Sequence, residues 1–500
     1  MTFTLHSLLP LLVVSSSLIT GVGIFFLPEK HATARSILNL TGAVVKLLLV
    51  VYMCWGAYAG EEYEARFSIV LGFDFLLRAD LLSLILVTLS SVLWLFTTIY
   101  AIGYMEGSPN RSRFFGFFSL CVTASVGVAL AGNLITFFIF YELLTLSTYP
   151  LVVHRGTEDS LEAGRTYLLY TMAGGAILFV GVVWLHVIAG PVDFQLAGVL
   201  HGLSAHVRPH LTIIFVLLIM GLGVKAALVP FHGWLPVAMV APAPVSALLH
   251  AVAVVKAGAF GIVRVVYDVY GIEFAHGLGV LTPLAVVASI TIIYGSLRAL
   301  AQDDLKRRLA YSTVSQVSYI VLGVSILGQT ATTGGVVHLV HQGLMKITLF
   351  FCAGLFAETV HVKSVSAMGG IGRRMPVTMA AFTIGAFGMI GVPPIAGFIS
   401  KWHLGLGALE AGQPWIIGVL LASTVLNAAY FLPILYVGWF KKPAQPWDTP
   451  EPNPGKEASY WLIVPAVATA LLALFAGLLA GNDWSPLGLA RAIALQEYLP

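Results

Sequence analysis

The chain has 500 residues, of which 58% are hydrophobic and only 10% are charged, with a formal net charge of +3. Soluble domains carry roughly 25% charged residues, so this composition excludes an ordinary soluble protein and indicates a polytopic membrane protein. No cluster of Lys and Arg is interleaved with aromatic residues, which argues against nucleic-acid binding. Cys54, Cys121 and Cys352 occur singly in apolar segments and form no disulfide framework, metal-binding pair or iron–sulfur spacing. We therefore expect no cofactor and no catalytic site.

Apolar runs long enough to cross a bilayer as a helix recur along the whole chain. Since such a helix needs about 20 residues, we expect an all-α integral membrane protein with about 14 transmembrane helices. The expected spans are residues 5–27, 36–59, 80–104, 113–131, 134–153, 164–189, 210–230, 243–268, 278–300, 307–327, 334–357, 376–402, 414–440 and 459–480. No basic segment precedes the first run, so we interpret it as a retained helix and not as a cleaved signal peptide.

The distribution of positive charge is consistent with this count and predicts the orientation. Of the 26 Lys and Arg residues, sixteen fall in loops after odd-numbered spans and five fall on the opposite side. Because cytoplasmic loops carry the excess of Lys and Arg, both termini are expected on the non-cytoplasmic side.

The remaining basic residues lie inside apolar runs, where an ionisable side chain usually faces a cavity, a partner or an ion path. They are Lys46, Lys225, Lys256, Lys346 and Lys401, and the one acidic residue identified well inside a run is Glu142. Gly and Pro also interrupt the seventh span after Lys225 and the twelfth before Lys401. A broken helix at membrane depth is tolerated only where protein or water satisfies the freed backbone groups. Buried amines beside broken helices indicate ion movement.

The two broken helices lie five spans apart, a pattern typical of inverted repeats that enclose an ion path. We expect helices 4 to 8 to repeat as helices 9 to 13, and the odd number of helices inverts the second copy. The expected parts are residues 1–105 with helices 1 to 3, residues 113–270 and 278–440 with the two repeats, and residues 441–500 with a Pro-rich polar loop, helix 14 and a short tail.

Glu142 and Lys225 are the first candidates for the path. They form either a fixed ion pair that holds two helices together, or a pair in which Lys225 exchanges a proton as Glu142 approaches or withdraws. On the eighth span, His250 and Lys256 would lie roughly 120° apart around a regular helix. Both side chains can still line one wide polar cavity, and both residue types can change protonation near neutral pH. A hydrogen-bonded packing role for His250 remains the alternative.

The eleventh span carries His338 and His341 one turn apart, with Lys346 on nearly the same face as His338. This HxxH spacing resembles half of a metal site, but no acidic residue or cysteine lies nearby in the sequence to complete one. We therefore expect a proton relay and no metal. Lys401 ends the row, with a snorkelling role near the membrane face as its alternative. Lys46 lies outside the expected repeats and is interpreted as a snorkelling or interface residue.

The tenth span adds hydroxyl and amide groups that can hold water or bind a neighbouring helix, although small polar residues also pack helix interfaces. They are Ser312, Ser315, Gln316 and Ser318.

Five stretches, in order along roughly residues 75–440, resemble the antiporter-like subunits of respiratory complex I and of Mrp-type cation/proton antiporters. They are YELLTLSTYPLV, KAALVPFHGWLPVAM, ALLHAVAVVKAG, DDLKRRLAYSTVSQ and GVPPIAGFISKW. The resemblance implies the fourteen-helix fold with inverted repeats. It also assigns family positions to seven of the candidates: Glu142 matches the fifth-helix glutamate, Lys225, Lys256 and Lys401 the lysines of helices 7, 8 and 12, and His250 and His338 the central-axis histidines with Lys346 beside them.

The first of these stretches and NAAYFLPILY of helix 13 are most similar to the Mrp D subunit. The complex I fourth-subunit type usually has a glutamate where Lys401 stands. The resemblance implies a proton-translocating subunit of a Na⁺/H⁺ antiporter in a prokaryotic plasma membrane, with other membrane subunits, the lipid bilayer, protons and Na⁺ as partners. Two alternatives stay open. One is a proton-pumping subunit of an NADH:quinone oxidoreductase or membrane-bound hydrogenase, and the other is a packing scaffold with an inert channel.

Overall fold

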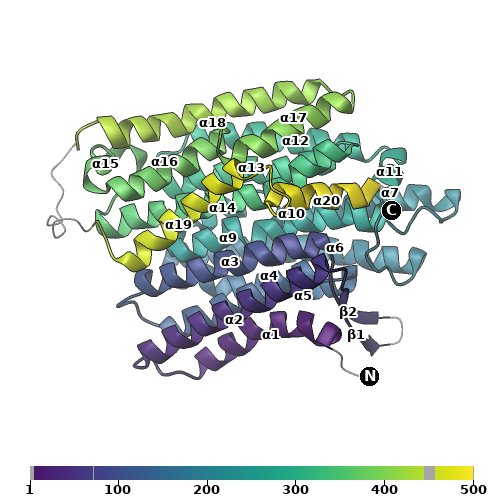
Figure 1. Cartoon of the computed structure of the whole chain (residues 1–500), viewed down its shortest axis with the longest axis horizontal. Helices are drawn as coiled ribbons and strands as arrows, with labels where there is room; N and C mark the ends of the chain where they lie inside the picture. Colours follow the sequence, from purple (N-terminus) through teal and green to yellow (C-terminus); the bar gives the residue numbers. More distant parts are fainter. Residues whose placement is uncertain (1–4, 71–72, 444–456, 499–500) are drawn as a thin grey trace.

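The computed structural model describes residues 5–70, 73–443 and 457–498. The axes of most helices are roughly aligned with one another, with α1 and α2 at one edge of the bundle and α18 at the opposite edge (Figure 1). The N-terminal elements are α1 (Leu5–Phe25), α2 (Ala32–Tyr58), β1 (Tyr63–Val70), β2 (Phe73–Ala79) and α3 (Leu81–Tyr104).

The first expected repeat contains α4 (Arg111–Leu130), α5 (Leu134–Val152), α6 (Glu158–Ala189), η1 (Ala205–Val207), α7 (Arg208–Lys225), α8 (Trp234–Val237), η2 (Ala238–Val240), α9 (Ala243–Ala251), α10 (Val254–Arg264) and the π-helical η3 (Val265–Tyr270). After the short α11 (Ile272–Gly277), the second contains α12 (Leu281–Leu300), α13 (Leu305–Val324), α14 (Gln329–Thr359), η4 (Val365–Ala367), α15 (Ile371–Arg374), α16 (Pro376–Ile390), α17 (Ala396–Glu410) and α18 (Trp415–Phe440). The chain ends with α19 (Tyr460–Leu478) and α20 (Pro486–Tyr498).

The all-α membrane class is confirmed, although the count of fourteen spans is not. Within the described ranges, 12 helices are long and apolar enough to cross a membrane. The tenth expected span falls on α13, and the twelfth is divided between α16 and α17; none of these three is among the 12. Most of the expected polar loop at 441–457 lies outside the described residues.

Side chains just before several helices fix where those helices begin. Asp80, Asn133 and Asp304 accept hydrogen bonds from backbone N–H groups three residues ahead, at 2.7–2.8 Å, before α3, α5 and α13. An Asp or Asn at this position satisfies one of the N–H groups that a helix start leaves free. These caps place the starts of the helices that surround the candidate site.

Strands β1 and β2 form an antiparallel hairpin that the sequence analysis did not anticipate. The hairpin lies against the turn between α4 and α5, where the N–H of Gly132 donates to the carbonyl of Leu76 at 2.8 Å. The register pairs Tyr63 with Ala79 and continues to Val70 opposite Phe73, with one irregularity after Ser68. The helical bundle therefore carries a small β element just before the start of α3.

The two expected helix breaks are present. Helix α7 ends at Lys225 and the chain turns before α8, while α16 ends at Ile390 and α17 begins at Ala396. In the first break, the indole N–H of Trp234 donates to the carbonyl of Val224 at 2.8 Å. The same carbonyl also accepts from the N–H of Ala227 at 3.1 Å, so the indole adds a second hydrogen bond at the end of α7.

The eighth span is also broken, between Ala251 at the end of α9 and Val254 at the start of α10. Side chains from other helices satisfy the carbonyls at this break. Ser125 of α4 donates to Val252 O at 3.3 Å, and Gln342 of α14 donates to His250 O at 3.4 Å. The break separates His250 from Lys256, so the angle expected for a regular helix does not apply.

Helix α14 is the centre of the bundle. It is almost entirely buried and packs against α3, α9, α13, α16, α17, α19 and α20. A helix that is buried on every side within a membrane protein must place its polar residues inside the protein, because it has no water-facing side. The two histidines and the lysine of α14 are therefore interior groups.

Candidate functional site

Lys225 is the last residue of α7 and is completely buried. Its ammonium Nζ donates to the backbone carbonyl of Tyr141 on α5 and lies 3.4 Å from the centre of the Tyr141 ring. The Tyr141 hydroxyl in turn donates to the carbonyl of Gly221 on α7 at 3.0 Å. Tyr141 therefore ties α5 to α7 and holds the Lys225 amine with both its carbonyl oxygen and its aromatic face.

Glu142, the next residue on α5, turns toward α6 rather than toward Lys225. A Cβ atom added at Gly175 of α6 would lie 2.4 Å from Glu142 Oε1, so the carboxyl group occupies the space that this glycine leaves. Oε1 is buried and has no hydrogen-bond partner among the described groups. Within those residues no ion pair shorter than 4.0 Å joins Glu142 to Lys225, although their charges interact. The expected partners are neighbours that are not in contact.

Lys256 lies at the start of α10, just beyond the break, with 0% of its surface exposed. Its Nζ has no hydrogen-bond partner among the described groups. The charge of Lys256 interacts with His338 and His341 of α14. No described contact joins Lys256 directly to Lys225, but their helices meet closely: a Cβ at Gly258 would lie 2.8 Å from the carbonyl carbon of Lys225.

His250, on the other side of the break, is stacked on Phe350 with ring centres 4.5 Å apart. Both ring nitrogens are buried without a hydrogen-bond partner among the described groups. The hydrogen-bonded packing role considered from the sequence therefore does not fit this imidazole. The charge of Lys346, on the neighbouring helix α14, acts on this imidazole.

Helix α14 carries three candidates, all with 0% exposed surface. His338 Nδ1 lies 2.7 Å from the hydroxyl of Ser400 on α17, and Lys346 Nζ donates to the carbonyl of Leu309 on α13 at 3.1 Å. His341, between them, interacts with Lys256. The helix therefore connects the break in the eighth span to both α13 and α17.

Lys401 lies on α17 but reaches back across the break in the twelfth span. Its Nζ donates to the carbonyls of Met389 and Ile390, the last residues of α16, at 2.9 and 2.8 Å. A positive charge at the carboxyl end of a helix is stabilised by the helix dipole. The amine also lies 5.4 Å from the centre of the Tyr319 ring, and its charge interacts with His338. The partly buried Lys401 side chain therefore bridges the break in the twelfth span.

The tenth-span polar residues have different environments. Ser312 contacts the Tyr430 hydroxyl at 2.8 Å, Ser315 contacts Ser296 at 2.9 Å, and Ser318 donates to its own helix at Val314. The amide of Gln316 is buried with neither its oxygen nor its nitrogen partnered among the described groups. Ser312 and Ser315 thus serve helix packing. Of the four residues, Gln316 has a side-chain donor and acceptor that no described group uses.

The interpretation of Lys46 as a snorkelling or interface residue is wrong. Its side chain has 0% exposed surface, donates to the hydroxyl of Ser17 on α1, and lies 4.8 Å from the centre of the Trp94 ring on α3. The error arose because α2 is at the edge of the bundle, yet Lys46 is on its inward face.

Asp268 is a second buried carboxylate that the sequence analysis missed, and Arg264, counted as a loop residue, is buried beside it. Arg264 pairs with Asp268 at 3.0 Å and with Asp80 at 2.8 Å. The spacing of four residues between Arg264 and Asp268 on one helix was an available signal. This cluster is charge-paired, so it joins the end of the eighth span to the start of α3.

A cleft of about 1350 Å³ opens beside this cluster. Its mouth is acidic, with Glu61, Glu62 and Asp483 among its walls, and its floor includes Val340 and Leu344 of α14. The cleft therefore reaches the surface of α14, but none of the eight candidates lines it.

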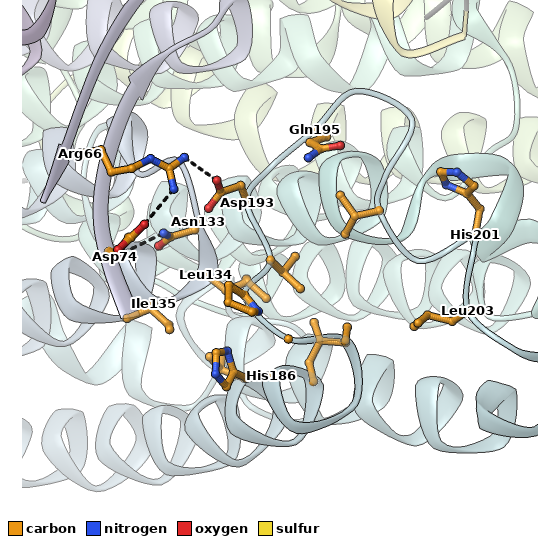
Figure 2. A pocket seen from close by; sticks show the side chains of 17 residues that line it. Arg66, Asp74, Asn133, Leu134, Ile135, His186, Asp193, Gln195, His201 and Leu203 are labelled. Atoms are coloured by element: carbon orange, nitrogen blue, oxygen red, sulfur yellow. Dashed lines mark hydrogen bonds and ion pairs between the residues drawn. The ribbon is translucent and has the colours of Figure 1, made fainter. Parts of the chain in front are cut away.

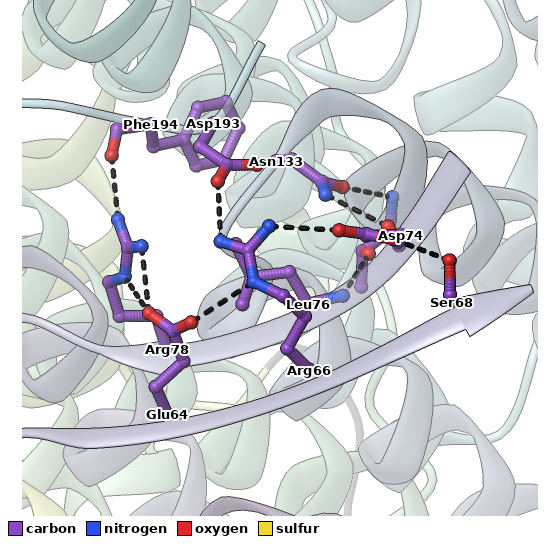
Figure 3. A network of polar contacts seen from close by, with 10 residues as sticks. Glu64, Arg66, Ser68, Asp74, Leu76, Arg78, Asn133, Asp193 and Phe194 are labelled. Atoms are coloured by element: carbon purple, nitrogen blue, oxygen red, sulfur yellow. Dashed lines mark hydrogen bonds and ion pairs between the residues drawn. The ribbon is translucent and has the colours of Figure 1, made fainter. Parts of the chain in front are cut away.

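A smaller hollow of about 580 Å³ lies beside the hairpin, with Arg66, Asp74 and Asn133 together on one side and His201 on the far side (Figure 2). The charged groups of this hollow are paired with one another, as Figure 3 shows: Arg66 donates to Asp74 at 3.0 Å and to Asp193 at 2.5 Å. The hydrogen bond from Arg66 holds the pKa of Asp74 below its ordinary value. This network fastens the hairpin to the loop after α6 and leaves the hollow without a free charge.

Glu64 extends the same network. Partial burial alone would raise the pKa of its carboxyl group, but the hydrogen bonds and charges of Arg78 and Arg66 outweigh burial and lower it. Arg78 binds Glu64 at 2.8 Å and the Phe194 carbonyl at 2.9 Å. Glu64 is therefore a charged structural group outside the membrane-spanning segments.

Taken together, the eight candidates occupy one interior region. The charge of Lys256 acts on His338 and His341, that of Lys401 on His338, and that of Lys346 on His250, while Glu142 and Lys225 form a neighbouring pair. Glu142, His250, Lys256 and Gln316 have buried polar atoms without partners among the described groups. Buried polar atoms are almost always bonded to protein or to ordered water. The arrangement therefore suits a hydrated row of groups that bind and release protons.

A family model described as "NADH:quinone oxidoreductase/Mrp antiporter, TM" matches residues 131–427, which is more than half of the chain. A second, "NADH-Ubiquinone oxidoreductase (complex I), chain 5 N-terminus", matches residues 68–115. The chain is 36% identical over 390 residues to NADH-quinone oxidoreductase subunit N of Desulforudis audaxviator, covering 76% of each chain. It is 28% identical over 415 residues to the D subunit of the Na⁺/H⁺ antiporter of Bacillus subtilis, covering 82% of this chain and 81% of that one.

A third relative, NADH-quinone oxidoreductase subunit L of Mycobacterium tuberculosis, is 33% identical, and the match spans 81% of this chain but only 63% of the relative. Two solved structures share the fold. A chain of an archaeal membrane-bound sulfane sulfur reductase has a TM-score of 0.87 at 22% identity, covering 98% of each chain. A chain of the Mrp complex from Dietzia sp. has a TM-score of 0.82 at 24% identity, covering all of this chain and 98% of that one. This multi-pass membrane chain belongs to the NADH:quinone oxidoreductase/Mrp antiporter transmembrane family.

Proposed function

We propose that this chain translocates protons as a membrane subunit of a multisubunit Na⁺/H⁺ antiporter of the Mrp D type. The observation that carries the proposal is the environment of Lys256. Its amine is fully buried beside a helix break, and its Nζ has no hydrogen-bond partner among the described groups. Its charge acts on two histidines, His338 and His341. Burial of an ammonium without a counter-ion costs several kcal/mol of desolvation free energy, so such an amine exchanges its proton readily. The similarity to an antiporter D subunit and the fold shared with the Mrp complex support this choice.

The proposed path has its members on five helices. It runs through Glu142, Lys225, Lys256, His338, Lys346 and Lys401, with His250 and His341 lining it. Water between these groups carries the proton over the gaps that the side chains leave. No covalent intermediate is needed, since each step makes and breaks only N–H or O–H bonds.

Glu142 controls Lys225 in this proposal. A carboxylate that approaches the amine stabilises its protonated form, and withdrawal leaves the neutral form favoured. In the structure the carboxyl group is withdrawn, because it fills the space at Gly175 instead of contacting Lys225. A change of the Glu142 side-chain conformation is therefore sufficient to change the charge that Lys225 prefers.

The two five-helix halves are further proposed to be inverted repeats, residues 113–270 and 278–440. Two similarities of packing support this proposal. Helix α4 packs against α5 as α12 packs against α13, and α6 packs against α7 as α14 packs against α17. Each half also contains a broken helix at the matching position, α7 with α8 and α16 with α17. The path would lie between the breaks.

Other membrane subunits are proposed as partners, together with the lipid bilayer of a prokaryotic plasma membrane. The proteins that share this fold are parts of membrane complexes by their titles, which supports an assembly. Both termini are proposed to face away from the cytoplasm, because sixteen basic residues fall in loops after odd-numbered spans. Sodium is the proposed counter-ion of the exchange.

A second function is favoured by a separate observation. The chain is 36% identical to a subunit of an NADH-quinone oxidoreductase, which is higher than its 28% identity to the antiporter D subunit. In that case, the same row of amines would pump protons, and electron transfer in another protein of the complex would drive it.

Proton movement in membrane vesicles distinguishes the two functions. The complete gene cluster would be expressed in a host without its own antiporters, and an acid-sensitive dye would report pH after addition of Na⁺, of K⁺, or of NADH. The antiporter predicts dye recovery on cation addition without an electron donor. Movement only with NADH would establish the redox pump instead, and no movement under any condition would overturn both.

A further inference from the structure

Lys46 has the features of the central row but lies outside it, on α2. Its amine is completely buried and contacts the Ser17 hydroxyl and the Trp94 ring. Ser17 in turn contacts the hydroxyl of Thr123 on α4 at 2.8 Å. The groups that face Lys46 from α1, α3 and α4 are thus hydroxyls and an indole, and no charged side chain of the described residues interacts with it. An ammonium here has no counter-ion, as at Lys256.

A row of unsatisfied polar atoms follows α3, and Lys46 contacts this row at the ring of Trp94. Ser90, Ser91, Trp94 and Thr98 are all buried, and the hydroxyl or indole N–H of each has no partner among the described groups. Ser90 and Ser91 are adjacent, and Trp94 and Thr98 follow at intervals of three and four residues, so all four lie within about 100° of one another on the face of α3 that touches Lys46 through Trp94. Four such atoms span about 12 Å of one helix face. Buried polar atoms without protein partners indicate ordered water.

Helix α3 connects Lys46 to the broken eighth span. It packs against α2 on one side and against α4 and α9 on others. On α9 lies His250, with two ring nitrogens that lack partners among the described groups, and on α4 lies Ser125, which binds the Val252 carbonyl in the break. The bundle arrangement places α3 between the α1–α2 edge and the central helices (Figure 1).

We propose that Lys46 is an additional proton-binding residue, reached from the break in the eighth span by water along the Ser90–Thr98 face of α3. A proton leaves a water at the break, passes along the water chain, and is taken up by the neutral amine of Lys46; the reverse transfer regenerates that amine. The row of protonatable groups then extends from α17 to the α1–α2 edge of the subunit. This inference rests on the proposed proton transport.

The chain offers a matched pair for the test. Thr97 and Thr98 are adjacent on α3 and both fully buried, but the Thr97 hydroxyl donates to the Leu93 carbonyl at 2.6 Å, whereas that of Thr98 has no partner among the described groups. Valine has nearly the same shape as threonine and removes only the hydroxyl. Thr98→Val is expected to slow cation-driven proton transport at least about threefold, and Thr97→Val to leave it within about twofold. Equal effects of the two substitutions would overturn the water chain.

Lys46 itself is tested with two substitutions. Lys46→Met is expected to slow transport by about tenfold and to change its pH profile, because one protonatable group is lost. Lys46→Arg keeps a positive donor for Ser17 but does not release its proton, so it should not restore transport. Restoration by arginine, or a Lys46→Met protein with the normal rate and pH profile, would show a structural role and overturn the proposal while leaving the antiporter function standing.

Hydration can be measured without transport. Hydroxyl radicals generated by X-ray radiolysis of bound water modify buried aromatic residues only where water lies beside them. In the purified assembly, Trp94 is expected to be oxidised and Tyr100 protected, since Tyr100 is equally buried on α3 but its hydroxyl donates to the Phe351 carbonyl at 2.9 Å. Protection of both residues would overturn the inference, whereas oxidation of Trp94 in a protein without transport would remove only the proposed function.

Discussion

The broken seventh and twelfth spans hold their lysines in different ways. Lys225 is the last residue before its break and reaches sideways to the Tyr141 carbonyl and ring on a neighbouring helix. Lys401 follows its break and reaches back to two carbonyls at the end of α16. The charge of Glu142 acts on Lys225, and no charged group of the described residues acts in the same way on Lys401.

From this difference we infer that the seventh span controls proton transport and that the twelfth span conducts protons. In the proposed path, the position of the Glu142 carboxylate sets the charge that Lys225 prefers, so the seventh span acts as the switch. Lys401 is held by the fixed backbone carbonyls at the end of α16, so its preference for the charged form does not depend on the position of another side chain. We therefore expect loss of the Glu142 charge to have a larger effect than loss of the Lys401 amine.

Loss of the Glu142 carboxylate is expected to have the largest effect. Glu142→Gln keeps the shape but removes the charge that acts on Lys225, and transport should fall about 100-fold. Glu158→Gln is the matched control, because Glu158 is exposed at the start of α6. Dye-monitored transport in vesicles with equal amounts of protein provides the comparison. A normal rate in Glu142→Gln would place the switch elsewhere.

Substitution of Lys401 is expected to slow transport by about tenfold. Lys401→Arg keeps a positive charge near the Met389 and Ile390 carbonyls but does not release a proton, so it should be as slow as Lys401→Ala. Initial rates and the yield of assembled complex would be measured together. Should arginine support the full rate, Lys401 would be a structural cap of α16 and not a member of the path.

The glycine opposite Glu142 offers a milder change. In Gly175→Ala the new Cβ would come within 2.4 Å of Glu142 Oε1, so the carboxyl group must move. Transport is expected to fall about threefold while the protein still folds, because the flexible side chain can yield. Gly418→Ala on α18 meets nothing within 4 Å and should leave the rate unchanged. Equal rates in the two variants would show that the resting place of Glu142 does not matter.

Tyr141→Phe is expected to have the smallest effect. It removes the hydroxyl bond to Gly221 but keeps the ring and the backbone carbonyl that hold Lys225. Transport should stay within about twofold of wild type, with a loss of stability of about 1 kcal/mol from the missing hydrogen bond. Thermal unfolding in detergent would measure the second part. A large loss of transport would mean that the hydroxyl itself carries protons.

The sequence predicted the membrane class, both Pro-rich breaks and six of the buried ionisable side chains, because an ionisable residue within an apolar run stands out. It did not predict the break at Val252–Ala253, since no Gly or Pro marks it, and its carbonyls are satisfied by Ser125 and Gln342 from distant segments. It also failed for Lys46, because the inward face of an edge helix depends on packing. The sequence indicates Lys225 as the partner of Glu142, but only side-chain positions show whether the two groups are in contact.

The most direct test of the account is a double-mutant cycle on Glu142 and Lys225 in proteoliposomes that contain the whole complex and an internal pH dye. A Na⁺ gradient would drive wild type, Glu142→Gln, Lys225→Met and the double variant. Because the account treats the two residues as one switch, it predicts that the double variant is no slower than either single variant. Losses that multiply in the double variant, or normal rates in both single variants, would contradict it.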